Sequence, residues 1–151
     1  MKYVLIKLTL GLLFTTSTFA YNSNDHFKPM AICGDRALVI DSKEITRTVD
    51  RSGRVERNTY YQSVLTNPEV IRYFLSTGAI SPEELNSYGE FIVELSKDQF
   101  SNSQYHGMRK GKVIELTINN YNSINLKVNS PIFDGSNEMA NFTFNDCRLL
   151  N

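Results

Sequence analysis

Few side chains in this 151-residue chain are of the types that usually bind metals or carry out redox chemistry. Zinc sites generally contain closely spaced ligand pairs, and redox sites generally use a Cys-x-x-Cys motif. Neither pattern occurs, so we expect no metal, no cofactor and no reactive thiol pair. The two histidines and two cysteines are His26, His106, Cys33 and Cys147.

Motifs that activate a nucleophile or cradle a phosphate are also missing. The chain has no Gly-x-Ser-x-Gly elbow, and the two glycines of GMRKG (residues 107–111) do not lead from a buried strand into a helix. We therefore expect a protein that is not an enzyme. A catalytic triad assembled from distant residues stays open as an alternative, because a single sequence does not reveal which residues meet in space.

The first twenty residues have the composition of a secretory signal peptide. Lys2 and Lys7 precede an apolar run, Leu8 to Phe14, and Thr18 and Ala20 supply the small residues before the expected cleavage site. The apolar run is shorter than the roughly 20 residues that span a bilayer, so we expect no membrane anchor after cleavage. We therefore expect the mature protein to be periplasmic or secreted.

Export bears on the two cysteines, because oxidising compartments favour disulfides. A Cys33–Cys147 bond would close a loop of more than 110 residues and stabilise the fold by up to about 5 kcal/mol. It would also place the segment around Cys33 beside the segment around Cys147.

After removal of residues 1–20 the chain has 14 basic and 16 acidic side chains, and this balance argues against nucleic-acid binding.

The sequence predicts a polar, mobile arm over residues 21–31 and a single α+β domain over residues 32–151. Residues 37–40 form an apolar run, and the two alternating segments that follow flank Gly53 as a β-hairpin would. Asn67, Pro68 and Gly78 have the positions of a cap, a first residue and a stop for one helix.

A second helix is expected over residues 81–97. Ser81 and Glu84 form a capping-box pattern, and polar residues recur at helical spacing, although Phe91, Val93 and Leu95 also alternate as in a strand. Three alternating segments follow residues 98–111 and predict antiparallel strands. The expected fold class is α+β: a curved antiparallel sheet of about six strands, in βββ-αα-βββ order, with a helical hairpin packed on it and its ends joined by the disulfide.

Residues 98–111 show no periodicity, and we interpret them as a long loop that binds a partner. Aromatic, Met and Arg side chains are enriched in protein interfaces. A flexible connector, with Phe100 and Tyr105 packed on a helix, is the alternative. The apolar pair Ile132 and Phe133 lies in a turn and either covers the core or anchors a partner. The expected binding residues are Tyr105, His106, Met108, Arg109, Lys110 and Phe133.

These features favour an exported, non-enzymatic protein-binding domain, such as an inhibitor or a toxin-immunity protein that blocks its partner sterically. Arg109 and Lys110 would steer the loop towards an acidic surface, while Tyr105 and Met108 would supply buried area. A small-ligand carrier or a small secreted enzyme or effector is the alternative. It would use a pocket between sheet and helices lined by Tyr60, Tyr88 and Phe91. Self-assembly through a sheet edge is a third possibility.

Overall fold

The computed structural model describes residues 26–120, 122–131 and 137–150, and these residues form a sheet of nine strands, one α-helix and one 3₁₀ turn. The predicted signal peptide, residues 21–25 of the predicted arm, and the pair Ile132 and Phe133 lie outside the described residues. The elements are β1 (Lys28–Cys33), β2 (Leu38–Thr48), β3 (Val55–Leu65), α1 (Pro68–Ser76), η1 (Pro82–Glu84), β4 (Phe91–Lys97), β5 (Gln104–Arg109), β6 (Lys112–Asn120), β7 (Ser123–Pro131), β8 (Asn137–Phe144) and β9 (Cys147–Leu149).

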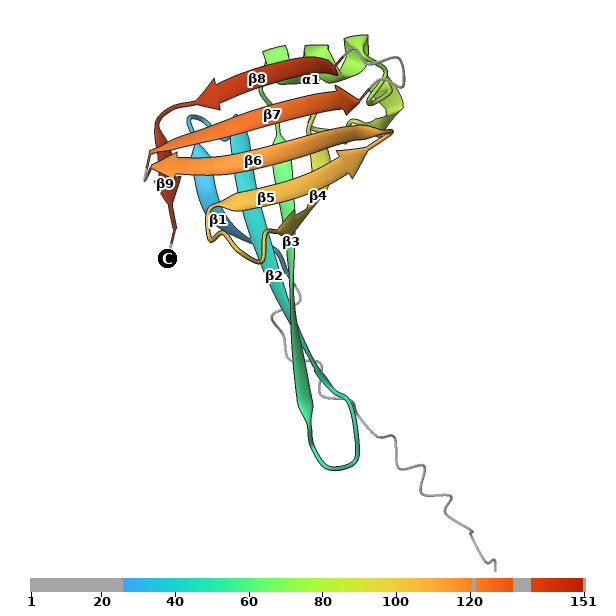
Figure 1. The fold of residues 1–151 in the computed structure, drawn as a ribbon, viewed down its shortest axis with the longest axis vertical. Helices are drawn as coiled ribbons and strands as arrows, with labels where there is room; N and C mark the ends of the chain where they lie inside the picture. The colour runs from blue at the N-terminus through green and yellow to red at the C-terminus, as the bar shows by residue number, and fades with distance from the viewer. Residues whose placement is uncertain (1–25, 121, 132–136, 151) are drawn as a thin grey trace, which may run out of the picture.

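Every strand pairs antiparallel with its neighbours, in the order β8-β7-β6-β5-β4-β3-β2-β1-β9. Strands β5 to β8 cross in front of β1 to β4, so that the sheet curls into a nearly closed barrel (Figure 1). β9 follows β8 in the chain but pairs with β1, at the opposite end of the sheet. The backbone N–H of Cys147 also donates to the carbonyl oxygen of Asn122, at 2.9 Å, next to the start of β7.

The barrel interior is filled by alternate side chains of the strands. In β4, Phe91, Val93 and Leu95 are buried, whereas the residues between them are exposed. This period of two is what a strand with one wet face requires. The largest fully buried side chains from the strands are Leu38, Ile40, Leu65, Phe91, Tyr105, Ile114, Leu116, Ile124 and Leu126.

Helix α1 packs its apolar face against one end of the barrel (Figure 1). The carboxamide oxygen of Asn67 accepts hydrogen bonds from the backbone N–H groups of Glu69 and Val70, at 3.0 and 3.1 Å, which confirms the expected cap. Val70 and Phe74 are buried in the core. The aromatic ring of Phe74 lies 5.5 Å from that of Phe91, so the helix joins the same core as the strands.

The predicted disulfide is confirmed. Cys33 in β1 lies directly opposite Cys147 in β9, with their Cα atoms 3.8 Å apart and their sulfurs bonded. Both residues are buried in the core cluster. The bond therefore joins the first strand to the last, as the sequence predicts, and a disulfide of this kind fits an extracellular or periplasmic protein.

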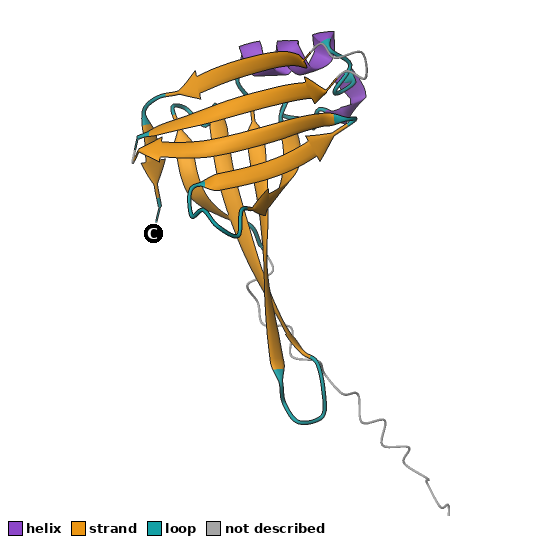
Figure 2. Cartoon of the chain, viewed as in Figure 1, coloured by secondary structure: helices purple, strands orange, loops and turns teal. Residues whose placement is uncertain are grey.

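The predicted α+β class is wrong, because the described residues are mostly β-strand with a single α-helix (Figure 2). The expected second helix is replaced by η1, a turn and β4. Ser81 and Glu84 do hydrogen-bond locally, but they cap only a single 3₁₀ turn. The Asn86 side chain then accepts from the backbone of Tyr88 and Glu90, and Gly89 has φ 72°. These contacts stop the helix and redirect the chain into β4.

The predicted strand count of about six is also too low. The expected loop over residues 98–111 contains β5, which pairs with β6 along its whole length. Residues 28–31, which we expected in the arm, belong to β1. The last strand is divided between β8 and β9 at Asp146, which has φ 55°. No helical hairpin covers the sheet in the described residues.

Gly107 permits the sharp change of direction between the two halves of the barrel. β4 and β5 pair only at Ser96↔His106 and Lys97↔Tyr105, and β5 then crosses over β4. A Cβ atom on Gly107 would lie 2.8 Å from the carbonyl oxygen of Glu94 and 2.9 Å from Val93 Cγ1. The absence of a side chain at this position therefore lets the two strands approach.

The disulfide generates the first prediction. Replacing both Cys33 and Cys147 by Ser should lower the free energy of unfolding by about 2–5 kcal/mol, because the unfolded chain is no longer cross-linked over a long loop. Urea unfolding of the oxidised wild type and the double variant measures this loss. Wild type treated with reductant should match the variant, and equal stability of all three proteins would contradict the structural role.

The second prediction concerns Gly107. Gly107→Ala should lower the free energy of unfolding by about 1–3 kcal/mol, because the methyl group meets the backbone of β4 and the strands must move apart. Met108→Ala, next to it on the exposed side, should change stability by less than about 0.5 kcal/mol. Thermal or urea unfolding of the two variants compares them, and equal losses would argue against the close crossing.

Candidate functional site

Strands β2 and β3 extend beyond the barrel as a two-stranded ribbon (residues 43–60). β1 pairs with β2 only as far as Ser42, and β4 pairs with β3 only as far as Tyr61. The two strands continue to pair with each other as far as Thr48 and Val55. Figure 1 shows the ribbon projecting from the body. Every residue from Thr46 to Tyr60 is exposed, so among the described residues most of the ribbon contacts only itself.

The ribbon carries an excess of positive charge. It has five basic and three acidic side chains, which gives a net charge of +2. Near its tip, Asp50 accepts hydrogen bonds from the Ser52 hydroxyl and from the backbone of Ser52 and Arg54. These bonds hold the pKa of the Asp50 carboxyl below its usual value, with the Ser52 hydroxyl as the main cause. The basic side chains are Lys43, Arg47, Arg51, Arg54 and Arg57.

An open groove of about 990 Å³ lies where the ribbon leaves the body; we call it the outer groove. Most of its lining side chains occupy strand positions that alternate with the buried ones, so the groove lies on the outer face of the sheet. Three apolar side chains at the groove are substantially exposed: Phe27, Tyr60 at 46% and Met108 at 72%. Other lining residues are Lys43, Gln62, Ser96, His106 and Val113.

The outer groove combines apolar surface with a small number of polar groups. The Lys43 ammonium lies 5.6 Å from the centre of the Phe27 ring, in a cation–π contact. Gln62 donates to the Asp41 carboxylate at 3.1 Å. Exposed apolar side chains beside a polar rim are typical of surfaces that bind other proteins.

The structure places His106 at this groove, on the outer face of β5. Its Nε2 lies 3.4 Å from a carboxylate oxygen of Asp98. The pKa of the Asp98 carboxyl is lowered, mainly by the backbone N–H of Phe100 and also by His106. Ser96 lies directly opposite His106 in the sheet. The residue types of a catalytic triad therefore meet here, and no hydrogen bond joins Ser96 to the imidazole among the described residues.

Tyr105 lies inside the barrel. Its side chain is 1% exposed and packs edge-on against the ring of Tyr61, with 5.3 Å between the ring centres. Burial raises the pKa of its phenol. Because strand residues alternate between the two faces, the burial of Tyr105 accompanies the outward orientation of His106 and Met108. Of the expected binding residues, Tyr105 is thus unavailable to a partner, whereas Met108 is exposed.

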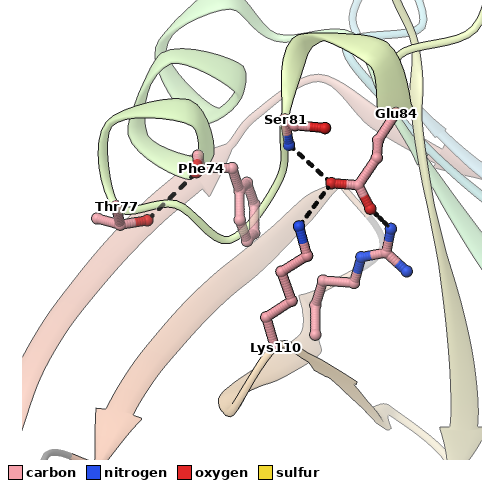
Figure 3. A network of polar contacts seen from close by, with 6 residues as sticks. Phe74, Thr77, Ser81, Glu84 and Lys110 are labelled. Atoms are coloured by element: carbon pink, nitrogen blue, oxygen red, sulfur yellow. Dashed lines mark hydrogen bonds and ion pairs between the residues drawn. The ribbon is translucent and has the colours of Figure 1, made fainter.

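Arg109 and Lys110 are engaged by a carboxylate of the same molecule. Both donate to Glu84, Lys110 from its Nζ at 2.9 Å, and the Ser81 backbone N–H donates to the same carboxylate at 2.7 Å (Figure 3). The Arg109 guanidinium also lies 5.5 Å from the centre of the Phe91 ring. These contacts join η1 to the β5–β6 turn. They give the two basic side chains a role inside the molecule.

The network strongly favours the ionised form of Glu84. Its pKa is lowered to about 2, first by the Ser81 backbone N–H and then by the hydrogen bond and charge of Lys110 and the charge of Arg109. A carboxyl whose pKa falls on folding stabilises the folded state wherever the unfolded chain has already lost that proton. The stabilisation is therefore present above the usual pKa of 4.5 and is lost as the pH falls towards 2.

The sequence predicts the hairpin but not its projection from the body, and it does not identify Phe27, Lys43, Gln62 or Ser96 as groove residues. A signal for the ribbon is present in KEITRTVDRSGRVERNTY, residues 43–60. Only three aliphatic residues occur there, Ile45, Val49 and Val55. Neither face of such a hairpin can bury a continuous apolar stripe, so the segment has nothing with which to pack on the body.

The residues expected to line a ligand pocket between sheet and helices do not meet. Phe91 is in the core, Tyr88 is 85% exposed in the turn before β4, and Tyr60 is at the outer groove. In the described part of the chain, no three metal-binding side chains cluster, and no helix has the length and apolarity needed to cross a membrane. Comparison with protein-family models, curated proteins and solved structures found no match to this chain.

The Glu84 network generates the third prediction. Glu84→Gln should lower the free energy of unfolding at pH 7, because the Arg109 and Lys110 charges lose their carboxylate partner. The difference between wild type and variant should shrink as the pH falls from about 4.5 towards 2, where wild-type Glu84 is also neutral. Urea unfolding across this pH range measures it. Glu44→Gln, on the exposed ribbon, serves as the control for simple loss of a negative charge.

Proposed function

We propose that this protein is an exported, non-enzymatic domain that binds another protein through the ribbon and the outer groove. The observation that carries this proposal is the ribbon: its two segments of β2 and β3, paired only with each other among the described strands, leave a nearly closed barrel beside an open groove. A two-stranded hairpin is marginally stable alone in water, and unpaired strand edges invite association. Such an extension is best explained by contact with a partner.

A filled barrel supports a binding role that uses the outside of the molecule. The interior positions are occupied by close-packed apolar side chains from the strands and from α1. A carrier of the barrel type holds its ligand in the interior. With that space occupied, the exposed apolar groups at Phe27, Tyr60 and Met108 are the surface most suited to recognition.

The mode of action that fits this shape is steric blocking, as in an inhibitor or a toxin-immunity protein. A narrow projecting ribbon can enter a cleft of a partner while the barrel covers the rim. The base of the ribbon is held by β1 and β4, so docking there orders few additional groups and little entropy is lost. The positive ribbon would favour a partner with an acidic surface, because complementary charge accelerates association.

Export through a leader at residues 1–20, to the periplasm or the medium, is part of the proposal. The Cys33–Cys147 disulfide supports export, because disulfides form and persist in oxidising compartments. It also joins β1 and β9, which pair with each other at only three positions.

The fourth prediction tests this function. Tyr60→Ala combined with Met108→Ala should reduce capture of a partner from the extracellular or periplasmic fraction of the source organism by at least about tenfold, because two exposed apolar anchors are lost. Immobilised, disulfide-bonded protein and quantitative mass spectrometry provide the measurement.

The matched control is Tyr88→Ala combined with Met139→Ala, which removes the same two residue types from exposed positions away from the groove. Both double variants should keep the wild-type melting temperature within a few degrees. Equal capture by the two double variants would argue that the partner binds elsewhere, and absence of any specific partner would argue against a binding role.

A further inference from the structure

We propose that the partner is recognised by strand addition: an extended segment of the partner pairs with the free edge of β3 over residues 55–60, and an acidic side chain of that segment lies opposite Arg57. This inference rests on the proposed binding function and specifies the contact that makes it. The free edge, the direction of its backbone groups and the placement of charge each support it.

The edge becomes free where β4 turns away. β4 pairs with β3 from Leu65↔Phe91 to Tyr61↔Leu95, and its next two residues, Ser96 and Lys97, pair with β5 instead. Among the strands that the structure describes, therefore, β3 beyond Tyr61 has β2 on one side and no neighbour on the other. An incoming strand would occupy the position that β4 vacates, next to the outer groove.

The backbone groups along this edge point towards the vacated position. At the end of the ribbon, the Val49 N–H donates to the carbonyl oxygen of Arg54 at 2.9 Å, so Arg54 belongs to a hydrogen-bonded pair with β2. Antiparallel strands alternate in this respect, and the ladder runs without a bulge from there to Leu65. Val55, Arg57 and Thr59 consequently direct their N–H and C=O groups away from β2, which offers three donors and three acceptors to a partner strand.

Side-chain alternation determines which partner residues meet which surface. Glu56, Asn58 and Tyr60 lie on the face of β3 that carries the outer groove, and Arg57 lies on the other face. A partner residue opposite Tyr60 would thus contact the groove and should be apolar. A residue opposite Arg57 should be Asp or Glu, because Arg57 is exposed and has no ion pair with any described carboxylate.

The same geometry disfavours a second copy of this chain as the occupant. Two β3 edges can pair antiparallel only by matching residues whose backbone groups point outward. The register with complete overlap of residues 55–59 sets Arg57 opposite Arg57, and like charges directly opposite each other are destabilising. The edge of β2 is less open at its base, where the Phe27 ring lies over Lys43.

The test uses a phage-displayed library of random 12-residue peptides, selected on the disulfide-bonded wild-type protein. Selected peptides are then titrated against three variants. Thr59→Pro removes an outward N–H from the β3 edge, and Thr46→Pro removes one from the β2 edge while leaving the ladder between the strands intact. Arg57→Glu reverses the charge. Melting temperatures and free-thiol assays establish that each variant is folded and oxidised.

The expected result is a consensus with alternating apolar residues and one Asp or Glu. Binding should weaken at least about tenfold on Thr59→Pro and stay within about twofold on Thr46→Pro. Arg57→Glu should also weaken it at least about tenfold, and replacing the acidic peptide residue by Lys should restore binding to that variant. If Thr59→Pro fails to fold, the charge reversal and its rescue decide the question.

Three outcomes overturn the inference: no enriched peptide, peptides that are sensitive to Thr46→Pro but not to Thr59→Pro, or a concentration-dependent dimer in sedimentation that Thr59→Pro abolishes. The proposed function fails separately, when the Tyr60 and Met108 double variant still captures the natural partner. Capture that survives Thr59→Pro and Arg57→Glu but not that double variant would retain the binding function and exclude strand addition.

Discussion

Pairing of the last strand with the first is the constraint on which the rest of this structure depends. Cys147 lies directly opposite Cys33, and the disulfide prevents β9 and β1 from separating. All other neighbours in the sheet are consecutive in sequence, so this contact converts an open meander into a nearly closed barrel. Closure encloses the alternate apolar side chains of both halves, and it gives the remaining elements a rigid base.

The barrel holds the ribbon at its start. Ser42 and Tyr61 are the last residues of β2 and β3 that have strand partners on both sides, and beyond them the hairpin is supported only by its own ladder. A rigid barrel that carries a ribbon with unpaired backbone N–H and C=O groups is a favourable arrangement for binding. The barrel needs no reordering, and the free edge of the ribbon supplies directional hydrogen bonds. The outer groove adds apolar contact area at the point where the two meet.

Basic residues of the same type have different roles because of their positions. Arg109 and Lys110 share the Glu84 carboxylate and hold η1 against the β5–β6 turn, so part of their positive charge is offset within the molecule. Arg57 pairs with no carboxylate of the described residues and remains exposed on the free edge. A cluster of basic residues in a sequence therefore says little about binding until the acidic residues around it are placed.

The sequence by itself determined the features that depend on neighbouring residues: the Asn67 cap of α1, the Ser81–Glu84 contact and the alternation of β6 to β8. It also determined the Cys33–Cys147 bond, because the chain has only two cysteines. Only the tertiary structure decided the rest. The pattern of residues 91–97 fits both a helix and a strand. The segment forms a strand because it pairs with β3. β5 has no strong pattern of its own, but Gly107 lets it cross β4 and bury Tyr105. Such outcomes depend on which segments meet in space, and that information is not present in any short stretch of residues.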